Sequence, residues 1–158
     1  MASSTTKKVL VRRFDRETLA GYVNPLSYLQ LRAIELLLAD GQVLSVPYAD
    51  IKMVAFVRDF EMSGETPRTF NTRPKMDGLW VRFEFRDDDL LEGIMPNNLL
   101  QVETYGFLAI PLNPVRDQRI FVPRAAVRSV SVLGVVGSPL NRRKPKPAVR
   151  DQIDLFEG

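Results

Sequence analysis

The sequence predicts a mainly β protein that contains two tandem copies of one small unit, followed by a flexible C-terminal tail. Three observations lead to this prediction: two stretches repeat at a constant spacing, short apolar runs alternate with polar residues, and the character of the chain changes at Ser138. We expect each copy to form a small barrel or curled sheet of roughly five strands. The copies should pack together, because about 50 residues alone make a marginal core.

The repeat is clearest in two segments that start at Val46 and Val122, 76 positions apart. Residues 46–57 and 122–133 share Val, Pro, Ala and Val at equivalent places. A second similarity lies upstream, where Leu19 starts a stretch that resembles the stretch from Leu91, 72 positions later. Matching order at both ends favours a duplicated unit, with extra residues in the middle of the second copy. The alternative is that the two stretches are similar only because small β proteins commonly use the same residues in turns and strands.

Alternation and turn residues predict the strands of each copy. Residues 81–85 alternate apolar and charged side chains, as in a strand with one buried face. Asp40 and Gly41 lie between two apolar runs and predict a hairpin. Pro47 and Pro123 should each end a strand or lie at an edge, because proline has no N–H to donate.

Residues 26–39 have a competing helical interpretation. Leu29, Ala33 and Leu36 fall near helical spacing, whereas the run before Asp40 has the composition of a strand. We therefore expect a strand at the end of this segment and leave its start open.

These signals divide the chain into five parts with different expected roles. They are a disordered N-terminus (1–8), the first β repeat (9–57), a polar connector (58–77), the second β repeat (78–137), and a basic linker with a C-terminal peptide motif (138–158).

The composition excludes several classes of chemistry. The chain has no cysteine and no histidine, so it offers no disulfide, thiolate metal site, Ser-His-Asp triad or imidazole base. No nucleophile elbow or phosphate loop is present, and we expect a non-enzymatic protein without cofactor or metal. The N-terminal residues lack the apolar run of a signal peptide, and no run is long enough to span a bilayer. We therefore expect a cytoplasmic protein.

The two copies resemble Sm-like small β-barrels. In that family a charged turn leads into a second strand that contains glycine, as Asp15-Arg16-Glu17 leads into Leu19-Ala20-Gly21-Tyr22-Val23. The family's basic-Gly pair before the final strand is absent, and Val46-Pro47-Tyr48 stands in its place. Ring formation and RNA binding are common in that family, but without this signature neither is transferred to this chain.

The end of the sequence differs from the β repeats. Residues 138–147 contain three prolines and no apolar period, which is typical of an extended basic linker. The peptide that follows resembles the bacterial sliding-clamp-binding pentapeptide, whose pattern is Gln, an aliphatic residue, Ser or Asp, then Leu-Phe. The residues that fill these places are Gln152, Ile153, Asp154, Leu155 and Phe156.

The resemblance implies that Gln152 forms hydrogen bonds in one subsite and that Leu155 and Phe156 fill an apolar pocket of the partner. Ile153 fills the aliphatic place, where leucine is commoner in that family, and this is the only soft departure. The leading hypothesis is therefore an interaction protein that docks a protein partner, with the DNA sliding clamp as the candidate. The alternative is that the peptide folds back as a last strand on the protein's own surface.

Basic residues of the linker give a rival hypothesis, which is nucleic-acid binding. These residues could contact phosphates, and they are Arg142, Arg143, Lys144 and Lys146. Phe83 and Phe85 could stack on bases only if exposed, and the alternation places them on the core face. Asp87-Asp88-Asp89 with Glu92 could suggest a cation site, but consecutive acids cannot all face one ion, and we expect a solvated turn.

Overall fold

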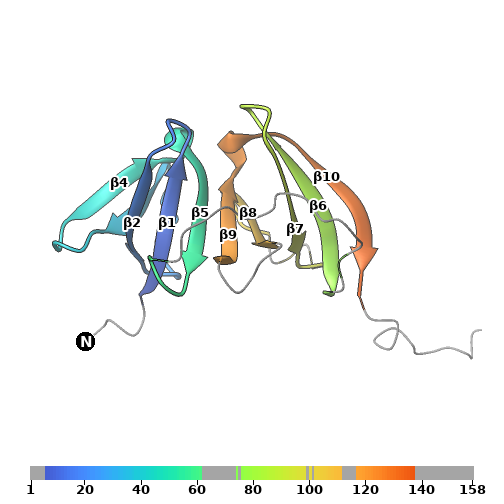
Figure 1. Cartoon of the computed structure of the whole chain (residues 1–158), viewed down its shortest axis with the longest axis horizontal. Coiled ribbons are helices and arrows are strands. Elements are labelled where there is room, and N and C mark those ends of the chain that lie inside the picture. Colours follow the sequence, from blue (N-terminus) through green and yellow to red (C-terminus); the bar gives the residue numbers. More distant parts are fainter. Residues whose placement is uncertain are drawn as a thin grey trace, which may run out of the picture.

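The computed structural model describes residues 6–61, 74, 76–98, 100, 102–111 and 117–137. In this part of the chain, ten antiparallel strands form one open sheet with almost no helix (Figure 1). The predicted mainly β fold class is confirmed. The strands are β1 (Lys7–Arg13), β2 (Thr18–Val23), β3 (Ala33–Leu37), β4 (Val43–Pro47), β5 (Ile51–Val57), β6 (Gly78–Phe85), β7 (Leu90–Met95), β8 (Gly106–Pro111), β9 (Asp117–Pro123) and β10 (Val127–Val136).

The strand order places the two halves of the chain side by side in one sheet. The order is β10-β6-β7-β8-β9-β5-β1-β2-β3-β4, so β1 to β5 stay together and β6 to β10 stay together. The halves join where β5 pairs with β9, with Val54 opposite Phe121 and Ala55 opposite Ile120. Figure 1 shows this junction in the middle and β4 and β10 at the two outer ends.

Strand pairing within the two halves follows the same register. Val9 lies opposite Gly21 in β1–β2, and Val81 lies opposite Gly93 in β6–β7, so both partners are shifted by 72 positions. The β1–β5 and β6–β10 pairings correspond in the same way, with β10 shifted by 76 positions from β5. The extra residues of the second half therefore lie between β7 and β9.

Strand β5 is buried on both faces, because its alternate side chains enter two different apolar clusters. Every residue of β5 is buried except Lys52, which is partly buried. The first cluster consists of Val9, Val11, Val23, Tyr28, Ile34, Leu36, Val46, Tyr48, Ile51, Val54, Phe56 and Phe121. The second consists of Leu10, Met53, Ala55, Val57, Val81, Phe83, Phe85, Leu91, Met95, Ala109, Ile120, Val122 and Ala126.

The predicted hairpin at Asp40 and Gly41 is confirmed. Gly41 has a φ of 90°, in the left-handed region, and the Asp40 carboxylate accepts a hydrogen bond of 2.9 Å from the Gln42 N–H. Strand β3 precedes this turn, so the strand expected at the end of residues 26–39 is confirmed. The start of the segment 26–39 is a turn, in which the Tyr28 N–H donates to the Asn24 carbonyl.

Both prolines end strands, as predicted. Pro47 ends β4 and Pro123 ends β9, and each precedes a single turn of 3-10 helix. Each proline is the N-cap residue of its turn and still has an extended backbone, with φ −63° and ψ 142° at Pro47 and φ −61° and ψ 145° at Pro123. The chain then enters the last strand of each half.

One expected boundary is wrong. Residues 1–8 are expected to be disordered, but Lys7 and Lys8 belong to β1, where they pair with Val23 and Tyr22 of β2. Pairing with a neighbouring strand therefore determines the backbone conformation of these two polar residues.

Replacing Gly21 with alanine should destabilise the fold more than replacing Gly93. A Cβ at Gly21 would lie 2.7 Å from the Leu37 carbonyl oxygen, whereas a Cβ at Gly93 would lie 3.0 Å from the Ile110 carbonyl oxygen. We expect Gly21→Ala to cost about 1–3 kcal/mol, as overpacking does, and Gly93→Ala to cost less. Urea denaturation of both variants measures the difference, and equal costs would contradict the closer approach at Gly21.

Candidate functional site

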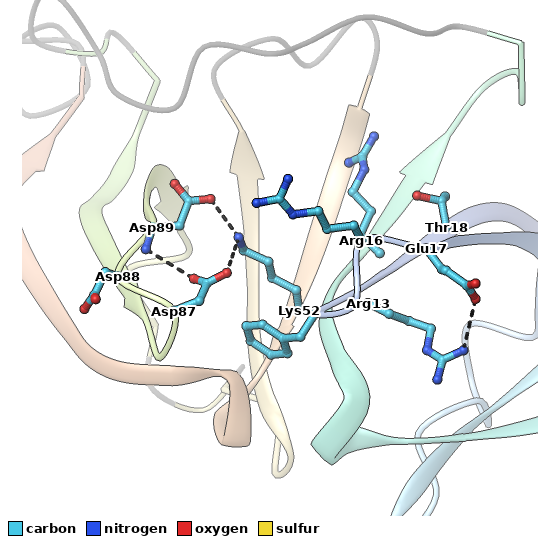
Figure 2. Close-up of a pocket in the computed structure, with 10 residues that line it drawn as sticks. Arg13, Arg16, Glu17, Thr18, Lys52, Asp87, Asp88 and Asp89 are labelled. Atoms are coloured by element: carbon cyan, nitrogen blue, oxygen red, sulfur yellow. Dashed lines mark hydrogen bonds and ion pairs between the residues drawn. The ribbon is translucent and has the colours of Figure 1, made fainter.

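A polar groove of about 610 Å³ lies where the two halves meet. The turn between β1 and β2 forms one side, the turn between β6 and β7 forms the other, and Lys52 of β5 lies between them (Figure 2). The residues that line it are Arg12, Arg13, Phe14, Arg16, Glu17, Thr18, Lys52, Asp87, Asp88 and Asp89.

Lys52 joins the two halves through two ion pairs. Its Nζ lies 2.9 Å from Oδ2 of Asp87 and 2.8 Å from Oδ2 of Asp89, across the groove (Figure 2). The Lys52 side chain is only 15% exposed, and its ammonium lies 5.1 Å from the centre of the Phe85 ring. These contacts fix the ammonium between two carboxylates and an aromatic face, where solvent screens it less than at an open surface.

The two turns have the same backbone design. Arg16 has a φ of 75° and Asp88 a φ of 73°, at places 72 positions apart in the chain. In each turn the preceding aspartate accepts a hydrogen bond from the backbone N–H two residues later, and these aspartates are Asp15 and Asp87. The turn expected at Asp87-Asp88-Asp89 is confirmed, but its outer carboxylates bind Lys52 rather than facing solvent alone.

Arg13 forms looser contacts on the other side of the groove. Its guanidinium lies 3.6 Å from Asp15, 3.7 Å from Glu17 and 3.9 Å from Asp50, all partly or largely exposed. Exposed pairs at such distances each contribute about 0–1 kcal/mol. The Nε of Arg13 is buried and has no hydrogen-bond partner among the described atoms.

Opposite charges balance in this groove. Four basic and four acidic side chains line it. A site for a polyanion would need an excess of positive charge. The groove therefore has the electrostatics of an internal junction between the two halves.

Glu92 is the buried carboxylate of the second half, at 2% exposure. Arg82 donates to its Oε2 from Nη2 at 2.8 Å and from Nε at 3.0 Å, and Trp80 donates to its Oε1 at 3.0 Å. Both carboxylate oxygens are therefore hydrogen-bonded, and the Arg82 guanidinium balances the charge. Its arrangement is that of a structural ion pair on the face of β6 and β7.

Titration properties of four described groups are shifted. Burial raises the pKa of Tyr48 to about 12, with Tyr105 adding to the effect, and burial also raises the pKa of Tyr28. Partial burial favours the neutral form of Asp87, but hydrogen bonds from Lys52 and from backbone N–H groups outweigh it and lower the Asp87 pKa. The pKa of Arg128 is raised by its hydrogen bond to Asp88. None of these shifts gives a general acid or base near neutral pH.

A second groove of about 550 Å³ lies at the other end of the β7–β8 pair. Its walls are mainly apolar, with charged residues at the margin. The residues that line it are Asp77, Ile94, Met95, Pro96, Glu103, Leu108, Ala109, Ile110 and Arg119. Neither groove contains a residue that the sequence analysis predicted as a site.

The predicted peptide and linker sites lie outside the described residues. These are Gln152, Ile153, Asp154, Leu155 and Phe156, with Arg142, Arg143, Lys144 and Lys146. Phe83 and Phe85 are fully buried, so neither is available to stack on a base. Within the described residues, no cluster of three or more potential metal ligands is found, and no helix is long and apolar enough to cross a bilayer.

Fold and site together define an all-β protein with one ten-stranded sheet and a charge-balanced groove at the junction of its halves. The chain belongs to a family of unknown function, DUF6982, whose model matches residues 5–134. No curated protein and no solved structure matches it. The match ends within β10, so the linker and the pentapeptide lie outside it.

Replacing Lys52 with methionine should destabilise the junction. The change keeps the apolar stem but leaves Asp87 and Asp89 side by side without their cation. We expect a loss of about 1 kcal/mol in the free energy of unfolding at pH 7. Arg16→Met, in the same groove, is the matched control and should change stability less.

The same variant should alter the acid limb of the stability curve. The folded-state pKa of Asp87 lies below its unfolded value of 3.8, so the ion pair stabilises the fold above that value and the stabilisation is lost as pH falls through the folded pKa. Unfolding measured between pH 2 and 7 should therefore depend less on pH in Lys52→Met, and an unchanged acid limb would contradict this role.

Proposed function

We propose that this is a non-enzymatic interaction protein, in which two copies of one five-stranded unit support a peptide, residues 152–156, that docks on a protein partner. The partner that best fits the peptide is the bacterial DNA sliding clamp. A reducing, cytoplasmic location fits the absence of cysteine.

Equal pairing registers support the tandem repeat. The β1–β2 and β6–β7 ladders correspond residue by residue, as do the β1–β5 and β6–β10 ladders. Two unrelated sheets would have no reason to share register, turn position and the two strand-ending prolines. A single duplicated unit accounts for all three.

The pentapeptide itself is the observation on which the function depends. Each of its five places is filled by a residue type that the clamp-binding pattern accepts. Burial of Leu155 and Phe156 in an apolar pocket could contribute about 3–6 kcal/mol before ordering costs. The Gln152 amide offers both a donor and an acceptor, which a polar subsite can recognise.

Properties of the folded body fit a supporting role. The groove at the junction is charge-balanced and internally paired, and the buried carboxylate of Glu92 is bound by Arg82 and Trp80. A catalytic site would place a nucleophile or a proton-transfer group with access to substrate. Among the described residues, the charged groups of these two places instead form ion pairs with one another, Lys52 with Asp87 and Asp89, and Arg82 with Glu92.

Replacing Leu155 and Phe156 with alanine should strongly weaken binding to the clamp. The full chain should bind purified sliding clamp, and Leu155→Ala with Phe156→Ala should weaken the affinity at least about 30-fold, which corresponds to about 2 kcal/mol. Calorimetry or surface plasmon resonance measures the change. Glu157→Ala, next to the motif, is the control and should leave the affinity nearly unchanged.

A synthetic peptide of residues 148–158 separates docking from fold-back. Binding of the peptide with the affinity of the full chain supports a free ligand. Equal affinity of the double variant and the natural chain would remove the clamp hypothesis, and so would no binding by either.

Four basic residues of the linker favour nucleic-acid binding as a second candidate function. If Arg142, Arg143, Lys144 and Lys146 each neutralise one phosphate of duplex DNA, the logarithm of the affinity should fall with the logarithm of salt concentration with a slope of about −3 to −4. Replacing all four with glutamine should remove most of that slope in fluorescence anisotropy. No binding at low salt would eliminate this candidate.

A further inference from the structure

We propose that copies of this chain assemble head to tail, with β10 of one copy pairing antiparallel with β4 of the next copy. The proposal rests on the β5–β9 junction that the chain already forms within itself. It adds a second copy of the chain as a partner, independently of the pentapeptide.

The two ends of the sheet correspond to the two strands of the internal junction. Strand β10 has the same place in the second half that β5 has in the first, and β4 has the same place in the first half that β9 has in the second. In the described structure, β10 pairs only with β6 and β4 pairs only with β3. Among the described residues, β10 therefore has an open edge equivalent to the edge that β5 uses at the junction, and β4 has an open edge equivalent to the one that β9 uses.

Exposure differs sharply between the internal junction and these edges. Phe56 of β5 is 4% exposed, whereas its counterpart Val132 in β10 is 59% exposed. Ile120 of β9 is 1% exposed, whereas its counterpart Leu44 in β4 is 37% exposed, and the adjacent Val43 is 65% exposed. At Val132 and Leu44 the open edges thus present apolar side chains at places that the junction buries, whereas Val43 has the place of Arg119, which is exposed at the junction.

Neither edge strand carries a row of charged residues, although β4 is short and the β10–β6 register shifts after Val127 and after Val132. Soluble proteins commonly place lysine, proline or inward-pointing charge along an edge strand. Strand β4 has no charged residue, and its proline is its last residue. Strand β10 is ten residues long and Arg128 is its one charged residue.

The internal junction also fixes the register of the proposed contact. Because Ala55 lies opposite Ile120, its counterpart Ser131 should lie opposite Leu44 of the next copy. By the same rule, Val132 should lie opposite Val43.

Charges that join the halves internally recur at the two ends. Lys52 at the start of β5 binds two carboxylates of the β6–β7 turn. Arg128 has the equivalent place in β10, and Asp15 and Glu17 have the equivalent places in the β1–β2 turn. In the single chain Arg128 binds acidic residues of its own half, and Arg13 lies near both acids of the β1–β2 turn. Head-to-tail pairing would bring Arg128 of one copy close to Asp15 and Glu17 of the next.

The contact joins two different edges, so each added copy leaves one edge of each type open. Such a heterologous interface gives a closed ring when the rotation closes and a filament when it does not. Both assemblies contain several copies of the chain, and both bury β4 and β10 at each contact between copies.

The mass of the natural chain in solution tests the proposal. Light scattering coupled to gel filtration should give a multiple of the 17.9 kDa chain. Val132→Lys and Val43→Lys should each reduce the mass to that of smaller species, because either places a charge in the apolar contact. Val135→Lys is the control, because Val135 is an exposed valine of β10 that lies beyond the expected pairing. This variant should leave the mass unchanged. If the natural chain has the mass of one copy, 17.9 kDa, even at high concentration, the proposal is overturned.

Cross-linking tests the register directly, because the chain contains no cysteine. Directly opposite residues of an antiparallel pair have Cα atoms about 4.5–5.5 Å apart, within disulfide range. Val132→Cys combined with Val43→Cys should therefore give a ladder of linked chains under mild oxidation with oxidised glutathione, and Val135→Cys with Val43→Cys should not. Equal linking in both pairs, or none in either, would overturn the proposed register, and circular dichroism confirms that the variants fold.

Discussion

The pairing of β5 with β9 is the constraint on which the rest of the structure depends. Through it, one strand supplies side chains to two apolar clusters, with Val54 and Phe56 on one face and Ala55 and Val57 on the other. Strand β9 in turn contributes to the first half, since Phe121 packs in the cluster of that half. Neither half therefore has a core made entirely from its own residues, which is how two units of marginal size obtain enough buried surface.

The groove follows from the same junction. Because β5 lies next to β9, the turns that precede β2 and β7 come to face each other across the start of β5. Lys52 is the residue at that point, and it binds carboxylates of the opposite half. Arg86 adds a second connection, since its guanidinium stacks 3.9 Å from the centre of the Phe14 ring and donates to the Ala49 carbonyl. The charges at this place thus orient the halves relative to each other.

Local features could be predicted from the sequence because their causes are local. Asp40 and Gly41 favour a tight turn, and Pro47 and Pro123 cannot continue a ladder, whatever surrounds them. The β5–β9 pairing joins distant segments, and no short motif encodes it. One signal was present: residues 53–57 are an unbroken apolar run, which is typical of a strand buried on both faces. The role of Lys52 could not be predicted, since it depends on this pairing.

The hydrogen bond between Trp80 and Glu92 has a practical consequence for following the molecule in solution. Trp80 is the only tryptophan in the chain, so its indole emission originates entirely from the second half. The stacked rings of Tyr48 and Tyr105 instead join the first half to the residue that precedes β8. Tryptophan fluorescence can therefore follow loosening of the second half without any added label.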